Sequence, residues 1–129
     1  KAPQQELSDK LAIELEKLSD SDTVETGLKC IRQLMHKYPK LEDFRMILSK
    51  ITPIIENVHV SLLYKENVVV LLGFLPSNYQ VSCLKFFPQI FRMISKLFNC
   101  PRLSLQQCCA RALCEYYSHV LIELSLEEK

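Results

Sequence analysis

The fold is indicated most clearly by FFPQIFRMISKLFNCPRLSLQQCCARALCEY, residues 86–116, in which apolar side chains recur every three or four positions on both sides of one short break. This spacing is the period of an α-helix that buries one face. The break is NCP, Asn99–Pro101, and it separates a helix expected at about Tyr79–Phe98 from another at about Leu103–Leu124. Because the connection is short, the two helices should pack antiparallel as a hairpin.

The rest of the chain repeats this pattern twice. Apolar periodicity predicts helices at about residues 6–18 and 23–38, and again at about residues 41–57 and 60–75. SDSD, Ser19–Asp22, should stop the first helix and cap the second; Pro39 should end the second, and PSN, Pro76–Asn78, should end the fourth. We therefore predict an all-α fold of about six helices in three antiparallel hairpins.

The composition suits a single domain, residues 1–129, with flexible ends at residues 1–5 and 126–129. Of the 129 residues, 48% are hydrophobic, which is enough to bury a core in a chain of this size. Sixteen Lys and Arg residues balance fifteen Asp and Glu residues, so the net charge of +1 predicts no attraction to nucleic acid. The longest apolar run, Val68–Leu75, is far shorter than the roughly 20 residues that span a bilayer, so no membrane segment is expected. A start at Lys1 without methionine predicts a fragment or a processed product.

Two stretches resemble the HEAT repeat, which is a pair of antiparallel helices. In residues 86–116, an A helix with an early proline is followed by a proline-containing turn and a B helix with small residues at a helical spacing. LAIELEKLSDSDTVETGLKCIRQLM, residues 11–35, is similar, and Val24, Leu28 and Ile31 are in the matching places. The chain departs from the HEAT pattern at its third turn, and the armadillo repeat is an equally good comparison. Either resemblance implies that the hairpins stack as a short HEAT/ARM-like right-handed solenoid.

Three of the six cysteines lie in CCARALC, Cys108–Cys114, which raises the question of a metal or redox site. At about 100° per residue, the three thiols point in directions about 100° or more apart, so this helix alone cannot bring them to one ion. Since no CxxC pair occurs and only two glycines are present, we interpret the cysteines as free, packed thiols of a reducing compartment, the cytoplasm or the nucleus. We predict no metal, no cofactor and no catalysis, because no acid–base, nucleophile or phosphate-binding motif is present.

Asn67 lies among Val and Leu residues in the fourth predicted helix. An unpaired buried amide would cost about 1 to 3 kcal/mol. Asn67 should therefore hydrogen bond internally or face the backbone of a ligand, as a matching asparagine does in some armadillo proteins. We expect the internal bond.

Polar residues form a stripe along the second helix of each hairpin. The HEAT and armadillo resemblance implies that these helices line a groove where a partner binds, and a solvated face without a partner is the alternative. The candidate groove residues are Glu25, Lys29, Arg32, His36, Ser61, Lys65, Gln107, Arg111, Glu115 and Ser118.

The last predicted helix has two apolar faces. One face, with Leu105, Cys109 and Tyr116, should pack on the rest of the domain, and the other is left over. A neighbouring repeat of the parent protein, a partner helix or a second copy of this chain would cover the leftover face. Its residues are Leu103, Cys114, Tyr117 and Leu121.

These features predict a non-catalytic scaffold for protein–protein interaction, which binds a peptide or helix of a partner protein or further repeats of its parent. One alternative is a tubulin-binding module resembling TOG domains, which use the turns between A and B helices; here only Arg102 makes the third turn basic. Another is a peptide-binding superhelix similar to VHS or ENTH domains. Those domains usually have eight helices, so the helix count separates the two interpretations.

Overall fold

The computed structural model describes the backbone of residues 2–127 and the side chains of all of these except residues 81, 82 and 127. This part of the chain contains no strand, which confirms the prediction of an all-α fold. Its elements are α1 (Pro3–Glu16), the 3₁₀ turn η1 (Lys17–Ser19), α2 (Val24–Lys37), α3 (Leu41–Glu56), α4 (Leu62–Tyr79), α5 (Val81–Lys85), α6 (Phe87–Leu97) and α7 (Leu103–Glu127).

The first helix begins three residues before its predicted start. Pro3 occupies the first turn of α1, where a proline is well tolerated because the N–H it lacks has no partner inside the helix. Residues 3–5 and 126–127, predicted as parts of flexible ends, thus belong to α1 and α7. Residues 1 and 128–129 of those predicted ends lie outside the described residues.

The predicted end of the fourth helix at PSN is wrong, because α4 continues through Pro76 to Tyr79. A proline inside a helix removes the N–H that would bond the carbonyl four residues earlier, which here is the carbonyl of Leu72. The hydroxyl of Tyr116 in α7 donates to that carbonyl at 2.8 Å. A side chain from another helix therefore replaces the missing bond, and the chain turns only at Gln80, which has a φ of 39°.

The helix predicted at about Tyr79–Phe98 is two helices. Α break at Phe86 separates α5 from α6, and Pro88 lies in the first turn of α6. This break makes seven α-helices in the described residues instead of about six. Seven is also different from the eight helices that VHS and ENTH domains usually have.

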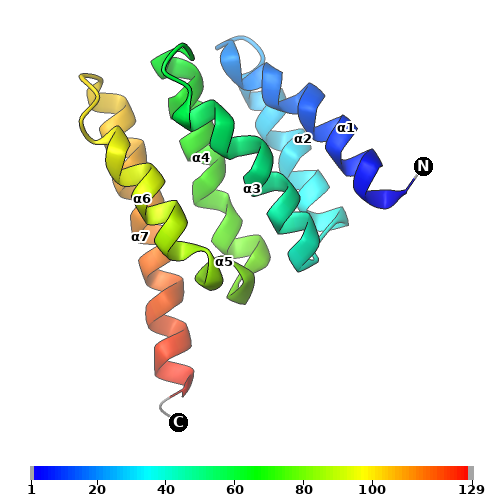
Figure 1. Cartoon of the computed structure of the whole chain (residues 1–129), viewed down its shortest axis with the longest axis vertical. Helices are drawn as coiled ribbons and strands as arrows, with labels where there is room; N and C mark the ends of the chain where they lie inside the picture. Colours follow the sequence, from blue (N-terminus) through cyan, green and yellow to red (C-terminus); the bar gives the residue numbers. More distant parts are fainter. Residues whose placement is uncertain (1, 128–129) are drawn as a thin grey trace.

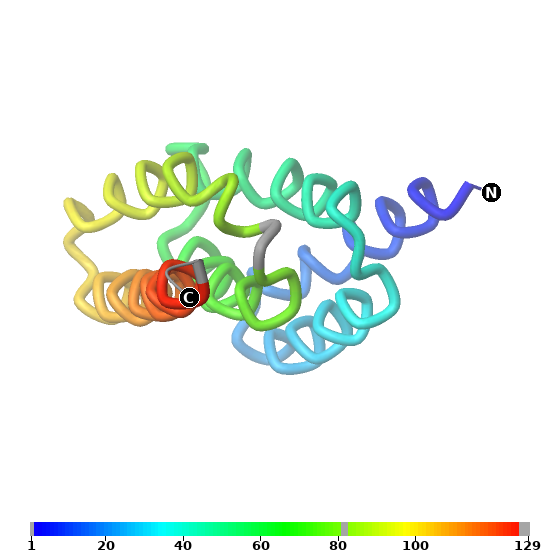
Figure 2. Tube along the Cα trace, turned by 90° about the horizontal axis from the view of Figure 1, so that it is seen from below, coloured from blue at the N-terminus to red at the C-terminus, as the bar shows by residue number. Residues whose placement is uncertain are grey.

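The long helices lie in two layers. In Figure 2, α1, α3 and α6 form one row, and α2, α4 and α7 form the other. The turns that join α1 to α2, α3 to α4 and α6 to α7 lie at one end of the molecule (Figure 1). Helix α4 packs against α2, α3 and α7, so it is central to the arrangement.

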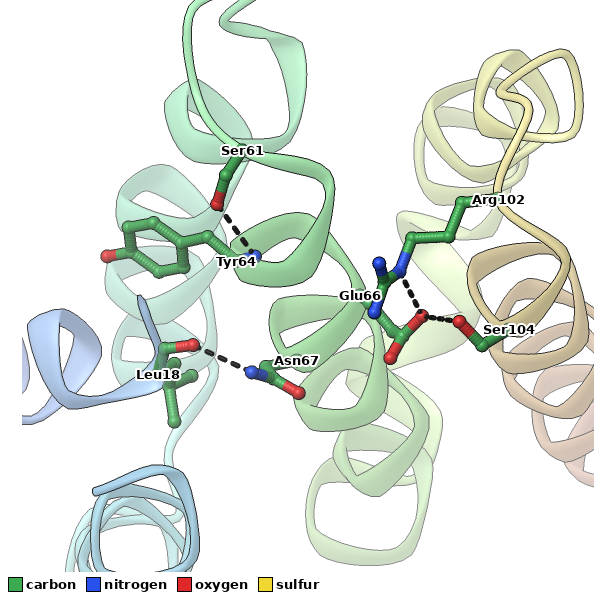
Figure 3. A network of polar contacts seen from close by, with 7 residues as sticks. All are labelled: Leu18, Ser61, Tyr64, Glu66, Asn67, Arg102 and Ser104. Carbon is green, nitrogen blue, oxygen red and sulfur yellow. Dashed lines mark hydrogen bonds and ion pairs between the residues drawn. The ribbon is translucent and has the colours of Figure 1, made fainter. Parts of the chain in front are cut away.

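Side chains of α4 and α7 donate hydrogen bonds to main-chain carbonyls of other helices. Besides the Tyr116 bond, the amide of Asn67 donates to the carbonyl of Leu18 at 2.8 Å (Figure 3), and the hydroxyl of Tyr79 donates to the carbonyl of Tyr38 at 2.8 Å. The internal bond predicted for Asn67 is therefore confirmed. These bonds tie η1, the C-terminal end of α2 and helix α7 to α4.

None of the helices in the described range, residues 2–127, has both the length and the apolar character needed to cross a membrane.

Candidate functional site

A cavity of about 390 Å³ lies between α2 and α4. Four of the predicted groove residues, Glu25, Lys29, Arg32 and His36, come together at its edge because they recur at helical spacing along α2. All four side chains are exposed. The cavity is completed by Leu28, Gln33 and, from α4, Phe74.

A larger cavity of about 570 Å³ lies between α4 and α7. It contains two more of the predicted groove residues, Arg111 and Glu115, which are both exposed. Most of the remaining lining is apolar or small, so this cavity suits an apolar side chain better than a charged one. That lining consists of Val69, Val70, Gly73, Phe74, Ser77, Cys108, Ala110, Ala112 and Cys114.

Phe74 lines both cavities, so they meet along one face of α2, α4 and α7. The guanidinium carbon of Arg32 lies 4.4 Å from the centroid of the Phe74 ring, within the range of a cation–π interaction. The half-buried ring and the exposed cation therefore form a ridge between the two cavities. We call the two cavities and this ridge the groove.

Lys65 does not belong to the groove, which corrects its assignment from sequence. Its side chain is only 7% exposed, because it shares the buried side of α4 with Val69 and Leu72. Ser61 lines neither cavity. It is the N-cap of α4, where its hydroxyl accepts a hydrogen bond from the N–H of Tyr64 (Figure 3).

Two further candidates, Gln107 and Ser118, are exposed on α7 but do not line either cavity. The Ser118 hydroxyl donates to the carbonyl of Cys114 four residues earlier, which is a bond within the helix.

The α4 side of the groove was missed from sequence. Val70, Gly73, Phe74 and Ser77 line the α4–α7 cavity from α4, and this helix is apolar nearly all round. The available signal was the pair of small residues Gly73 and Ser77, spaced one turn apart beside an aromatic ring. Small residues at that spacing leave space along a helix surface.

An ion pair closes one end of the α4–α7 contact (Figure 3). The Glu66 carboxylate accepts hydrogen bonds from Arg102 Nε, at 3.0 Å, and from the Ser104 hydroxyl. Burial would raise the pKa of Glu66, but the two hydrogen bonds and the charge of Arg102 outweigh it and hold that pKa below its ordinary value. The charge of Arg102 is thus already paired.

Three of the six cysteines are made unreactive by burial. Burial raises the pKa of the Cys83 and Cys109 thiols to about 12, and it also raises the pKa of Cys108. Such thiols stay protonated near neutral pH and are poor nucleophiles. All six cysteines are free, and no cluster of metal-binding side chains occurs among the described residues.

The last hairpin carries most of the exposed apolar surface. Of the ten large apolar side chains exposed among the described residues, only Ile13 and Val58 lie elsewhere. Three of the predicted residues of the leftover face are prominent, since Leu103, Tyr117 and Leu121 are 67%, 47% and 65% exposed, and Cys114 is exposed beside them. The others are Phe91, Phe98, Ile122, Leu124 and Leu126.

Comparison of the chain with protein-family models, with curated proteins and with solved structures returned no match.

Proposed function

We propose that this protein is a non-catalytic interaction scaffold, a short HEAT/ARM-like solenoid of helical hairpins that binds a peptide or helix of a partner protein in the groove. One observation carries the proposal: Phe74 joins the two cavities, and Arg32 lies against its ring. A partly exposed aromatic ring at the centre of a groove, with polar groups around it, is the usual composition of an energetic hot spot.

The charges and the lining suggest which peptide fits. The α4–α7 cavity is mostly apolar and would take a large apolar side chain. Beside it, Lys29 and Arg32 outnumber the single acid Glu25 at the edge of the α2–α4 cavity. A segment with a large apolar residue close to an Asp or Glu therefore complements both halves of the groove.

Selection from a random peptide library displayed on phage would test this function. The intact chain should enrich peptides with an apolar residue near an acidic one. Arg32→Glu and Phe74→Asp should each weaken binding of the selected peptides by at least about tenfold, as expected for a central hot spot. The Arg32 side chain is exposed, so its substitution should leave the fold intact.

Ile13→Asp is the matched control, because Ile13 is 61% exposed on α1 and lines neither cavity of the groove. Circular dichroism of each variant would show that its helices are intact. The proposal fails if no peptide family is enriched, or if the selected peptides bind the Arg32 and Phe74 variants as well as they bind the unaltered chain.

The tubulin-binding alternative has less support. It would need free basic side chains in the turns between paired helices, whereas Arg102 is bonded to Glu66 and the first turn carries Asp20 and Asp22.

A further inference from the structure

Exposed residues of α7 follow the spacing of a coiled-coil seam. Ala110, Cys114, Tyr117, Leu121 and Leu124 are separated by four, three, four and three residues, and every one of them is exposed. This alternation keeps one face of a helix turned toward a second helix. We call these five residues, with Leu103 and Gln107 that continue the pattern toward the N-terminus, the α7 seam.

The seam is separate from the face that α7 buries. The buried side chains are Leu105, Cys109, Ala112 and Tyr116, which lie on the other side of the helix. The distal half of α7 also extends past its partner α6, as Figure 1 shows, and beyond Tyr116 no described side chain is fully buried. This half of the helix therefore has an apolar face that the described residues of the chain leave largely exposed.

Aromatic contacts hold the middle of the seam in place. The Tyr117 ring meets the rings of Phe87 and Phe91 of α6 edge to face, with centroids 5.2 and 6.5 Å apart. Because α6 already fixes this ring, an incoming helix would lose little side-chain entropy in packing on it.

We infer that the seam pairs with the same seam of a second copy of this chain, with the two α7 helices antiparallel. The size of the side chains points to this arrangement. The N-terminal half of the seam is small or polar at Gln107, Ala110 and Cys114, and the C-terminal half is large at Tyr117, Leu121 and Leu124.

Antiparallel pairing places each large residue opposite a smaller one. Counting along the two helices, Cys114 faces Tyr117, Ala110 faces Leu121 and Gln107 faces Leu124 of the other copy. Parallel pairing would instead set Tyr117 against Tyr117 and Ala110 against Ala110, which overfills one layer and leaves a gap in another.

Charge favours the same orientation. The N-terminal half of α7 carries Arg111 and no acidic residue, Glu115 lies at the middle of the helix, and the C-terminal half carries Glu123. Antiparallel copies bring the acidic half of one helix toward the arginine of the other and oppose their helix dipoles. Parallel copies would set Glu123 beside Glu123 of the other copy and align the two helix dipoles.

The size of the surface predicts a weak dimer. From Leu103 to Leu124 the seam spans about 32 Å, and a strip about 10 Å wide along it, together with the adjoining length of α6, gives roughly 500 Å² per copy. The total of about 1,000 Å² is at the lower limit for a specific interface, so we expect dissociation in the micromolar range.

Analytical ultracentrifugation across the micromolar range tests the pairing. The chain should change from monomer to dimer with increasing concentration, and Leu121→Glu should raise the dissociation constant at least tenfold while leaving helicity unchanged, because this side chain is 65% exposed. Ile13→Glu, at a similarly exposed apolar residue of α1, should leave the dissociation constant unchanged. A monomer at all concentrations, or equal dimerisation of the two variants, would overturn the inference.

Cross-linking with a short bismaleimide, followed by peptide mapping, tests the orientation. In the antiparallel pair the two Cys114 residues are about 4.5 Å apart along the helix axes, so they should be cross-linked. In a Cys114→Ala background, Gln107→Cys should give no cross-link to itself, because about 25 Å of helix separates the two copies of that position. A Gln107→Cys dimer linked at that position would refute the antiparallel arrangement and indicate parallel pairing.

The seam shares Ala110 and Cys114 with the α4–α7 cavity of the groove, so the variants that separate the two proposals are placed outside this overlap. Arg32→Glu should leave the dimer intact, and Leu121→Glu should not weaken binding of the selected peptides, because Leu121 lines neither cavity. Arg32 and Leu121 each belong to one of the two surfaces alone, so these variants distinguish failure of the seam from failure of the groove.

Discussion

Removal of the Tyr116 hydroxyl should weaken the attachment of α7 to α4. Tyr116 is fully buried, and its hydroxyl donates to the carbonyl of Leu72 at 2.8 Å. In an uninterrupted helix that carbonyl would accept from the N–H of residue 76, but Pro76 has none. Tyr116→Phe therefore takes away the donor that replaces the missing N–H, while the aromatic ring and its stacking on Phe87 at 5.8 Å remain.

The expected loss follows from the cost of a buried polar group without its partner. That cost is about 1 to 3 kcal/mol. An unfolding entropy of about 2.1 cal/mol/K per residue gives roughly 0.27 kcal/mol/K for 129 residues, so the midpoint of thermal unfolding should fall by about 4 to 11 °C. Scanning calorimetry and urea titration measure both quantities.

Pro76→Ala allows a double-mutant test of the mechanism. Alanine restores an N–H that can bond the Leu72 carbonyl within α4, so Tyr116→Phe should cost less in this background, with a coupling of at least about 0.5 kcal/mol. Tyr117→Phe, which removes a hydroxyl from an exposed neighbour, is the control and should change stability by less than about 0.5 kcal/mol. The explanation is refuted if the effects of Pro76→Ala and Tyr116→Phe are additive, or if Tyr116→Phe costs no more than the control.

Two further predictions concern helix packing and charge. An added Cβ at Gly27 would lie 3.0 Å from the Glu14 carbonyl oxygen, so Gly27→Ala should lower the free energy of unfolding by about 1 to 3 kcal/mol. At Gly73 the nearest atom, the Cα of Ala112, is an ordinary 3.6 Å away, so Gly73→Ala should raise the free energy of unfolding by up to about 1 kcal/mol; urea titrations that show the same sign at both glycines would contradict this. The folded pKa of Glu66 lies below its ordinary value of 4.5, so its stabilisation is complete above that value and is lost as the pH falls through the lower folded pKa. The midpoint of thermal unfolding should therefore fall less between about pH 5 and pH 3 in Glu66→Gln than in the unaltered chain. An equal fall in both proteins would rule out this role of Glu66.

The helices could be predicted from sequence because each buries a face whose apolar period is local information. The apolar period of residues 86–116 correctly predicted that α7 begins at Leu103. A rotation of about 100° per residue also put Cys109, which is buried, and Cys114, which is exposed, on different faces of this helix. Asn67 was also predictable, since burial of an amide among Val and Leu residues requires a partner.

The groove could be predicted only in part, for a physical reason. Along α2 the polar stripe is the only exposed stripe, so Glu25, Lys29, Arg32 and His36 were found. Helix α4 is apolar nearly all round, and which of its faces stays open depends on how α2, α3 and α7 pack around it. Polarity alone therefore selected Lys65, which is buried, and passed over Phe74, which joins the two cavities.

The misplaced end of α4 illustrates how a proline acts in this fold. Α proline or a helix end leaves a carbonyl without its helical donor, and such a carbonyl is available to a side chain from elsewhere. The carbonyls of Leu18, Tyr38 and Leu72 are of this kind. Leu18 lies in the short turn η1, Tyr38 is the C-cap of α2 just before Pro39, and Leu72 is four residues before Pro76. Each accepts from a side chain of α4 or α7. The effect of Pro76 was therefore not a local property: it depends on Tyr116, 40 residues later in the chain, which turns a weak point of one helix into a contact between two.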